Sequence, residues 1–403
     1  MHDIDQFFQD SDYNILRVLL GAVGLWPFHT RNRRYTIYIV IMLLLGSALL
    51  FQLLDIIAIR NDFFAVINTI PFILHFIIVI NKAICSIYKL PQIKILLIMM
   101  YEYRISPKSD EETKLQNLHS QYGRKLSYTY MGCLIGFYAL YYLIDTLSVR
   151  TIRTKYNETE ELSNKTLHYQ ISGISSSINS TLVDEDTESL PIFIHFFMCD
   201  CVAIILIIVS DVLYVTVTEY CCGLFAALRY RLEFALIFDN NELTITEDKS
   251  YSNIVYSIRR HIESIQFVTN MESVLSLNLF VQTGSFVLII ALLVYEVTNI
   301  GIFMGRSYIV KAVAYLNFVL INVFFENWLG QKIIDSSEKV FESVYNAEWY
   351  SMPIITRKLL IMLMMKTEKP LMLKMGKLFE LSFATFNTIL RTSSSYFMLL
   401  QSL

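Results

Sequence analysis

The sequence predicts an all-α membrane protein with seven transmembrane helices, its N-terminus cytoplasmic and its C-terminus extracellular. Hydrophobic residues make up 54% of the 403 residues and charged residues only 17%, whereas a soluble domain carries about 25% charged residues. The mean hydropathy is +0.47. The net charge of −3 gives no bulk basic signal, so we expect no nucleic-acid partner.

Six apolar stretches are long enough to cross a membrane, because a bilayer core of about 30 Å needs roughly 20 residues of helix. They cover residues 35–59, 63–87, 126–149, 191–217, 273–296 and 307–328. A seventh stretch, 380–403, is less apolar and carries Asn387, Arg391 and three consecutive serines. A polar helix of this length suits a water-lined wall better than a lipid-facing one. The alternative is an amphipathic helix that lies on the membrane.

Two independent features predict the orientation. Most lysines and arginines lie in the N-terminus and in the connections 82–125, 218–272 and 329–377, and the basic side of a membrane protein is normally cytoplasmic. The glycosylation sequons at Asn157, Asn164 and Asn179 all lie in the 150–190 loop, and glycan acceptors face the exterior. Both features put the N-terminus inside. A G-protein-coupled receptor, the alternative seven-span protein, has the opposite orientation.

The chain is expected to divide into three parts. Residues 1–328 form a six-helix transmembrane bundle with cytoplasmic extensions and the glycosylated loop 150–190. Residues 329–379 carry apolar side chains at helical spacing, and these helices would form a cytoplasmic anchor if partner chains covered their other face. Residues 380–403 form the last helix.

No pattern typical of an enzyme occurs in the sequence. It holds no Gly-x-Ser-x-Gly, no His-Glu-x-x-His and no glycine-rich phosphate loop, and its 7 histidines do not cluster. Cys199 and Cys201 resemble half a metal site, but no second Cys/His pair completes it. We therefore expect no catalytic residue, no metal and no cofactor.

The closing residues resemble the C-terminal signature of insect odorant receptors. The matching elements are Trp349-Tyr350 in the last cytoplasmic loop, Pro370-Leu371 opening a helix, Gly376, Leu381-Ser382, Thr385-Phe386 and Ser395-Tyr396-Phe397. Elsewhere the chain is similar to the family in topology, length and loop pattern. The resemblance implies an odorant-gated, non-selective cation channel in the dendritic plasma membrane of an olfactory sensory neuron. Such a channel is a heterotetramer of odour-specific subunits and a shared co-receptor subunit, surrounded by membrane lipid.

The resemblance also implies where the functional parts lie. The cytoplasmic helices would anchor the subunits to one another, with Trp349 and Tyr350 at the assembly interface. The sister gustatory receptors and the co-receptor end with a tyrosine followed six positions later by a glutamine. Here Gln401 follows Tyr396 by five positions, and Ser402 takes the expected glutamine place. This departure favours an odour-specific subunit over the alternative, a gustatory-type homomeric channel.

The resemblance implies that the second half of the last helix lines the pore. The candidate pore and gate residues are Leu399, Ser402 and Leu403. Leu399 and Leu403 are four residues apart, so they share one helix face. A ring of such apolar side chains can close a channel by excluding water. The alternative is helix packing at a frayed terminus.

The odorant pocket is expected in the outer half of the bundle, where aromatic residues are frequent. A small volatile needs a mostly apolar cavity with one or two polar anchors. The candidate ligand contacts are Phe72, His75, Phe76, Phe137, Tyr138, Tyr141, Tyr142, Phe193, Phe196, Phe197, Asp200 and Phe286. For each ring, core packing is the alternative. An acid such as Asp200 is costly inside a membrane, so it either contacts ligand or pairs structurally with His75 or Lys311.

Overall fold

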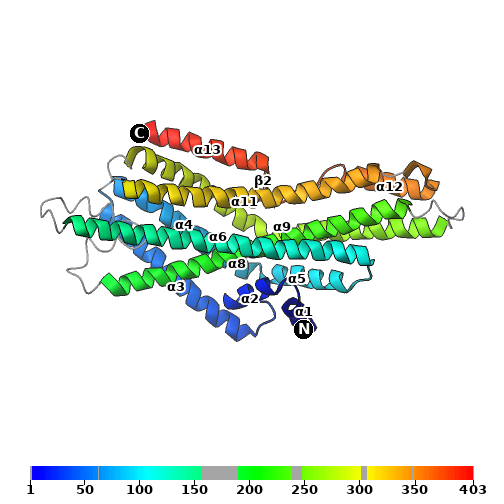
Figure 1. Ribbon diagram of the computed structural model, residues 1–403, viewed down its shortest axis with the longest axis horizontal. Coiled ribbons are helices and arrows are strands. Elements are labelled where there is room, and N and C mark those ends of the chain that lie inside the picture. The colour runs from blue at the N-terminus through cyan, green and yellow to red at the C-terminus, as the bar shows by residue number, and fades with distance from the viewer. Residues whose placement is uncertain are drawn as a thin grey trace.

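The computed structural model is an elongated bundle whose long helices run side by side along one axis (Figure 1). It describes residues 2–61, 63–156, 189–237, 247–300, 306–346 and 349–402. The first part of the chain forms α1 (His2–Asp10), α2 (Asn14–Ala22), α3 (Arg31–Ile59), α4 (Phe63–Tyr88), α5 (Leu90–Ile105) and α6 (Asp110–Tyr156).

The second part of the chain forms the remaining elements. Its long helices are α8 (Ser189–Ile237), α9 (Glu247–Tyr295) and α11 (Arg306–Tyr345), and its shorter ones are α12 (Ile354–Thr367) and α13 (Phe383–Ser402). The π-helix η1 (Glu296–Ile300) extends α9, and the 3-10 turn η2 (Trp349–Ser351) precedes α12. Two short strands, β1 (Lys374–Met375) and β2 (Phe379–Glu380), lie between α12 and α13.

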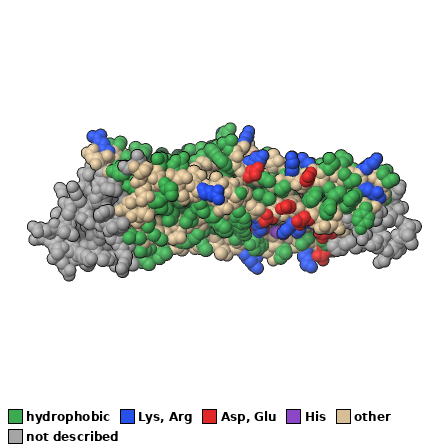
Figure 2. Space-filling model, turned by 90° about the horizontal axis from the view of Figure 1, so that it is seen from above, with side chains coloured by type: hydrophobic (Ala, Val, Ile, Leu, Met, Phe, Trp, Pro, Cys, Tyr) green, Lys and Arg blue, Asp and Glu red, His purple; other side chains and the backbone are tan. Residues whose placement is uncertain are grey.

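The bundle has two halves of different character. The helices α6, α8, α9 and α11 run through both, whereas α3, α4 and α13 flank one end and α5 and α12 the other (Figure 1). On the face seen in Figure 2, charged side chains gather over the half that holds α12 and are sparse over the other. We call the half with α3, α4 and α13 the apolar half, and the other the polar half.

The apolar half has the properties of a membrane-embedded bundle. Leu43 of α3 is 69% exposed, and Leu54 and Ile57 of the same helix are also exposed. Apolar side chains exposed along a whole helix require lipid or a partner rather than water. Among the described residues, five helical segments are long and apolar enough to span a membrane: Arg31–Ile59, Ala65–Tyr88, Ile194–Glu233, Tyr251–Asn299 and Tyr308–Tyr345. The prediction of a multi-pass helical membrane protein is thus confirmed.

The two remaining predicted spans are helical but less apolar. Residues 126–149 lie within α6, and the last predicted span lies largely within α13. Neither is among the five apolar segments found in the described residues. The count of seven spans and the orientation of the termini therefore stay predictions.

A buried polar network holds the helices of the apolar half together. Lys82 of α4 forms an ion pair with Asp211 of α8, with 2.6 Å between Nζ and Oδ1. The hydroxyl of Tyr130 on α6 lies 2.7 Å from Asp211 Oδ2 and 2.7 Å from Asn322 Oδ1 on α11. One turn further along α11, Glu326 accepts a hydrogen bond from the side-chain amide of Gln282 on α9. These contacts fix five helices, α4, α6, α8, α9 and α11, against one another.

The expectation that Pro370-Leu371 opens a helix is wrong. The segment instead forms a hairpin in which Lys374 pairs with Glu380 and Met375 with Phe379. Gly376 and Lys377 both have positive φ, of 60° and 61°, and the Leu378 amide donates to the Met375 carbonyl at 3.2 Å. Two successive residues with positive φ are typical of the type I′ turns that join hairpin strands, and they are incompatible with a continuous α-helix.

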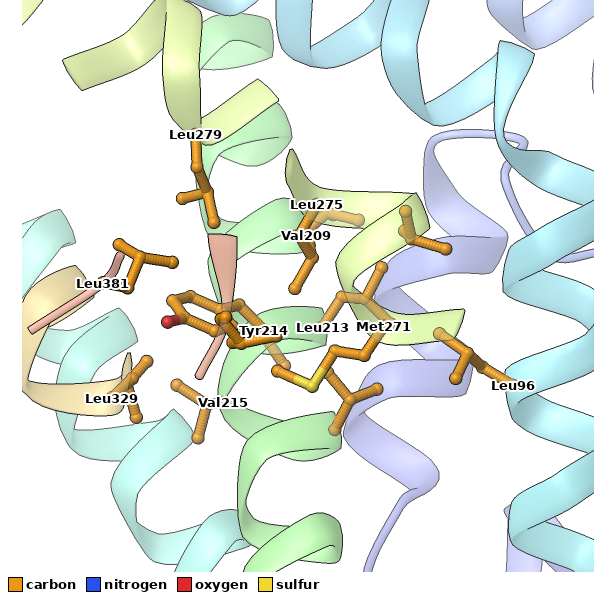
Figure 3. Packing of buried hydrophobic residues seen from close by; sticks show 14 of the residues in the cluster. Leu96, Val209, Leu213, Tyr214, Val215, Met271, Leu275, Leu279, Leu329 and Leu381 are labelled. Atoms are coloured by element: carbon orange, nitrogen blue, oxygen red, sulfur yellow. The ribbon is translucent and has the colours of Figure 1, made fainter. Parts of the chain in front are cut away.

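The core continues where the two halves meet. Figure 3 shows Tyr214 of α8 among Leu279 of α9, Leu329 of α11 and Leu381, which directly follows β2. All four side chains are buried. A Cβ at Gly330 would lie 2.3 Å from the Leu381 Cβ. Gly330 is therefore the position at which α11 lets the start of α13 approach closely.

We expect Gly330→Ala to lower the thermal unfolding temperature of the detergent-purified protein. The added methyl group must displace Leu381, and overpacking of this kind costs about 1–3 kcal/mol. Gly284→Ala on α9 is the matched control, since a Cβ there meets nothing within 4 Å and helix propensity favours alanine by up to about 1 kcal/mol. Equal unfolding temperatures for the two variants would contradict the close approach.

Candidate functional site

A cavity lies between four helices of the apolar half. Its empty space, counted together with the open mouth, is about 520 Å³. The lining residues come from α4 (Phe72, His75), α6 (Phe137, Tyr138, Tyr141), α8 (Asp200) and α11 (Ala314, Tyr315, Phe318). The cavity lies toward the end of the bundle where α6 ends and α8 and α11 begin.

Aromatic rings make the walls of the cavity. Phe72 and Tyr315 stack across the α4–α11 contact, with ring centroids 5.6 Å apart and an interplanar angle of 12°. Phe318 turns its edge to Tyr138 at 5.5 Å and to Phe137 at 6.2 Å. Offset and edge-to-face ring pairs are the favoured aromatic arrangements, so these walls are packed against one another rather than left loose.

Two polar groups face this apolar space. The His75 Nε2 and the Tyr138 hydroxyl are 2.9 Å apart, while the buried His75 Nδ1 has no hydrogen-bond partner in the described structure. Asp200 is buried and accepts a hydrogen bond from the Tyr142 hydroxyl. A few polar groups among rings is the composition of a site that orients a small ligand.

The structure brings together half of the predicted ligand contacts. The predicted residues that line the cavity are Phe72, His75, Phe137, Tyr138, Tyr141 and Asp200. Tyr142 is not a lining residue; its hydroxyl donates to Asp200, and its ring meets Tyr141 at 6.3 Å and Phe197 at 5.7 Å. Phe76 and Phe286 are buried in the core, and Phe196 packs against Phe51 of α3. Phe193 lies in α8, with its side chain outside the described part of the structure.

Three lining residues were not predicted from the sequence: Ala314, Tyr315 and Phe318. All come from α11, whereas the predicted rings lie in the second to fifth spans. The signal was present, because Tyr308, Tyr315 and Phe318 follow one another at intervals of seven and three residues and so share a helix face. Ala314 beside them leaves the space that a larger side chain would fill.

The predicted pore and assembly residues lie away from the cavity. The helix α13 lies on the outside of the bundle against α9 and α11 (Figure 1). Leu399 is 58% exposed, and Ser402 is also exposed. Trp349 is half-buried against the core, whereas Tyr350 is 62% exposed. Leu403 and the three sequon asparagines, Asn157, Asn164 and Asn179, lie outside the described residues.

Comparison with known proteins identifies the family. Residues 62–394 match the family model described as 7tm odorant receptor. The chain belongs to the odorant receptor family. The resemblance in its closing residues is thereby confirmed, and membership of a receptor family agrees with the prediction that it is not an enzyme.

Individual odorant receptors match over shorter stretches. Odorant receptor 10 of Aedes albopictus is 22% identical over 148 residues, 37% of this chain and 39% of that protein. Odorant receptor 67a of Drosophila melanogaster is 26% identical over 140 residues, 35% of this chain and 34% of that protein. The odorant receptor coreceptor of Drosophila melanogaster is 26% identical over 153 residues, 38% of this chain and 31% of that protein. The matches thus span less than half the length of these relatives.

The fold matches over nearly the whole chain. The insect olfactory receptor OR5 from Machilis hrabei, in complex with eugenol, superposes with a TM-score of 0.74 over 96% of this chain and 97% of that one, at 13% identity. A second structure of the same receptor superposes with a TM-score of 0.66, over 96% of each chain. The helical architecture of an insect olfactory receptor is therefore shared at low sequence identity.

We expect Ala314→Phe to abolish binding of small ligands by occupying the cavity. The new ring would enter the space bordered by Tyr315 and Phe318, at a cost of about 1–3 kcal/mol where it overpacks. The measurement is ligand-induced thermal stabilisation of the purified protein across a panel of volatiles. Ala139→Phe, on the exposed face of α6, is the control and should bind as the parent does. Stabilisation of Ala314→Phe by the parent's ligands would show that they bind elsewhere.

Proposed function

We propose that this chain is the odour-specific subunit of an odorant-gated, non-selective cation channel. It binds a volatile organic ligand in the cavity between α4, α6, α8 and α11 and opens a pore lined by α13. The aromatic cavity carries the proposal, because an apolar site with few polar groups suits a small volatile compound. The family match and the eugenol complex of the Machilis hrabei receptor support it.

The chain would cross the plasma membrane of an olfactory sensory neuron dendrite seven times, with α6 and α13 as the third and seventh spans. The basic cytoplasmic connections and the sequons at Asn157, Asn164 and Asn179 support an N-terminus inside and a C-terminus outside. Figure 1 supports the same arrangement, because the C-terminus lies at the end of the bundle where α6 ends and α8 begins. The cavity is then in the outer part of the membrane.

Assembly with a co-receptor subunit into a heterotetramer would use the polar half. There α12 exposes an apolar stripe made of Ile354, Ile355, Met362 and Met365. Such a stripe outside lipid marks a protein contact. Trp349 would hold the turn before α12 against the core while the exposed Tyr350 meets the partner. The altered register of Gln401 relative to Tyr396 supports a heteromer rather than a homomer.

The exposed face of α13 would become the pore wall in such an assembly. Leu399, Tyr396 and Met398 are all exposed, and no described helix of the same chain covers them. In a tetramer, four such faces can meet around one axis. Leu399 and Leu403 would then form the apolar gate, with Ser402 beside it.

Currents recorded with and without an insect co-receptor test the function. We expect a panel of volatiles to open an inward cation current only when both subunits are expressed. The current should persist in excised patches without GTP, because ligand binding and pore opening occur in one complex. A response that disappears when GTP is withheld would instead indicate a G-protein-coupled receptor.

We expect Leu399→Ser and Leu403→Ser to raise the current without ligand. A polar ring lets water into the constriction, so the closed state loses its advantage. The rank order of volatiles should not change, since the cavity is untouched, whereas Tyr141→Ala should change that order with little resting current. Leu43→Ser on the exposed face of α3 controls for a polar residue in lipid. A reordered panel with baseline resting conductance would contradict the pore assignment.

A further inference from the structure

Three acids on α8 are buried, and they differ in how they are compensated. Asp211 forms its ion pair with Lys82 of α4. Glu219 forms an ion pair with Lys332 of α11 and a hydrogen bond with His119 of α6, with 3.2 Å between Oε2 and Nδ1. Asp200 has no lysine, arginine or histidine within ion-pair distance among the described residues, where the hydroxyl of Tyr142 is its hydrogen-bond partner. Asp200 is also the one of the three that lines the cavity.

An uncompensated acid at this depth is costly. A buried carboxylate needs a cation or several hydrogen bonds to offset its lost hydration, and inside a membrane the water that would supply them is missing. One hydroxyl offers a single donor. The parallel with Asp211 and Glu219 indicates that the partner missing from Asp200 is a cation, and the cavity is the space from which it can come.

The walls of the cavity suit the same kind of ligand. The faces of aromatic rings attract a cation held within about 6 Å of their centres, and Phe72, Phe137, Tyr315 and Phe318 supply such rings. They also provide flat apolar surfaces for an aromatic body. The unpartnered Nδ1 of His75 adds a second polar contact from α4.

We propose that the cavity binds a small volatile arylalkylamine, whose ammonium group pairs with the carboxylate of Asp200 and whose ring lies among Phe72, Tyr315 and Phe318. This proposal rests on the proposed channel function only where ligand potency is measured as a current. The binding itself can be measured on the purified protein.

The test compares three ligands that differ in one group: 2-phenylethylamine, 2-phenylethanol and propylbenzene. Each is applied to cells that express the chain with a co-receptor, and each is tested for thermal stabilisation of the purified chain. We expect the amine to be the most potent of the three. Asp200→Asn should weaken the amine by roughly 10–100-fold, the range of a lost charge-assisted hydrogen bond, and change the two neutral ligands little.

Two further variants separate charge from structure. Asp200→Glu keeps the carboxylate and should restore most of the preference for the amine. Tyr142→Phe removes the hydroxyl that Asp200 accepts from but leaves the acid, so the amine should remain preferred. Native-gel migration with the co-receptor confirms that each variant assembles.

The outcomes are distinguishable. Equal or greater potency of the alcohol or the hydrocarbon, or an equal loss of all three ligands in Asp200→Asn, would overturn the amine site. Other volatiles opening the current while the amine neither opens it nor binds would also overturn the site and leave the channel function standing. Binding of the amine that depends on Asp200, without any current, would support the site and count against the channel.

Discussion

The Lys82–Asp211 ion pair is the contact on which the apolar half depends. Both side chains are buried, and removal of one partner from a buried pair costs about 3–5 kcal/mol because the other charge stays uncompensated. Tyr130 extends the pair to Asn322 on α11, so one polar cluster ties α4, α6, α8 and α11 together. The same four helices line the cavity. The orientation of the helices that form its walls is therefore held by this polar cluster as well as by the contacts between the rings.

The helix α11 joins the cavity to the proposed pore wall. Tyr315 and Phe318 line the cavity, and Gly330 on the same helix touches Leu381 at the start of α13. The 12 residues from Phe318 to Gly330 correspond to about 18 Å of helix. A packed helix transmits a displacement over such a distance because protein interiors are dense. The helix α11 thus connects the wall of the proposed ligand cavity to the segment that leads into α13.

The sequence was sufficient to predict the apolar helices but not their rotation. Lipid-facing and core-facing residues are both apolar, so hydropathy detected α3, α4, α8, α9 and α11 directly. Phe72 and Phe76 share a face of α4 by spacing, yet only Phe72 reaches the cavity, because Phe76 lies one turn deeper in the core. The hairpin at Gly376 was missed because the close approach of Phe280, 2.6 Å from a Cβ placed there, is a tertiary contact. The rings of α11 share a helix face by spacing, but their place opposite Phe72 of α4 is a tertiary contact that spacing alone does not give.

The selectivity of such a cavity resides in its few polar atoms. An apolar wall distinguishes ligands that differ by one methylene by only about 1–3 kcal/mol, whereas a site built to satisfy a polar group rejects ligands without it far more strongly. In the proposed site, the rings of Phe72, Tyr315 and Phe318 would set the size and shape of the ligand. Asp200 and His75 would set its chemistry. Asp200 is compensated by a single hydroxyl among the described residues, although the neighbouring acids of α8 have cationic partners. An acid kept at that cost beside a cavity is better accounted for by the proposed recognition of a ligand than by a contribution to stability.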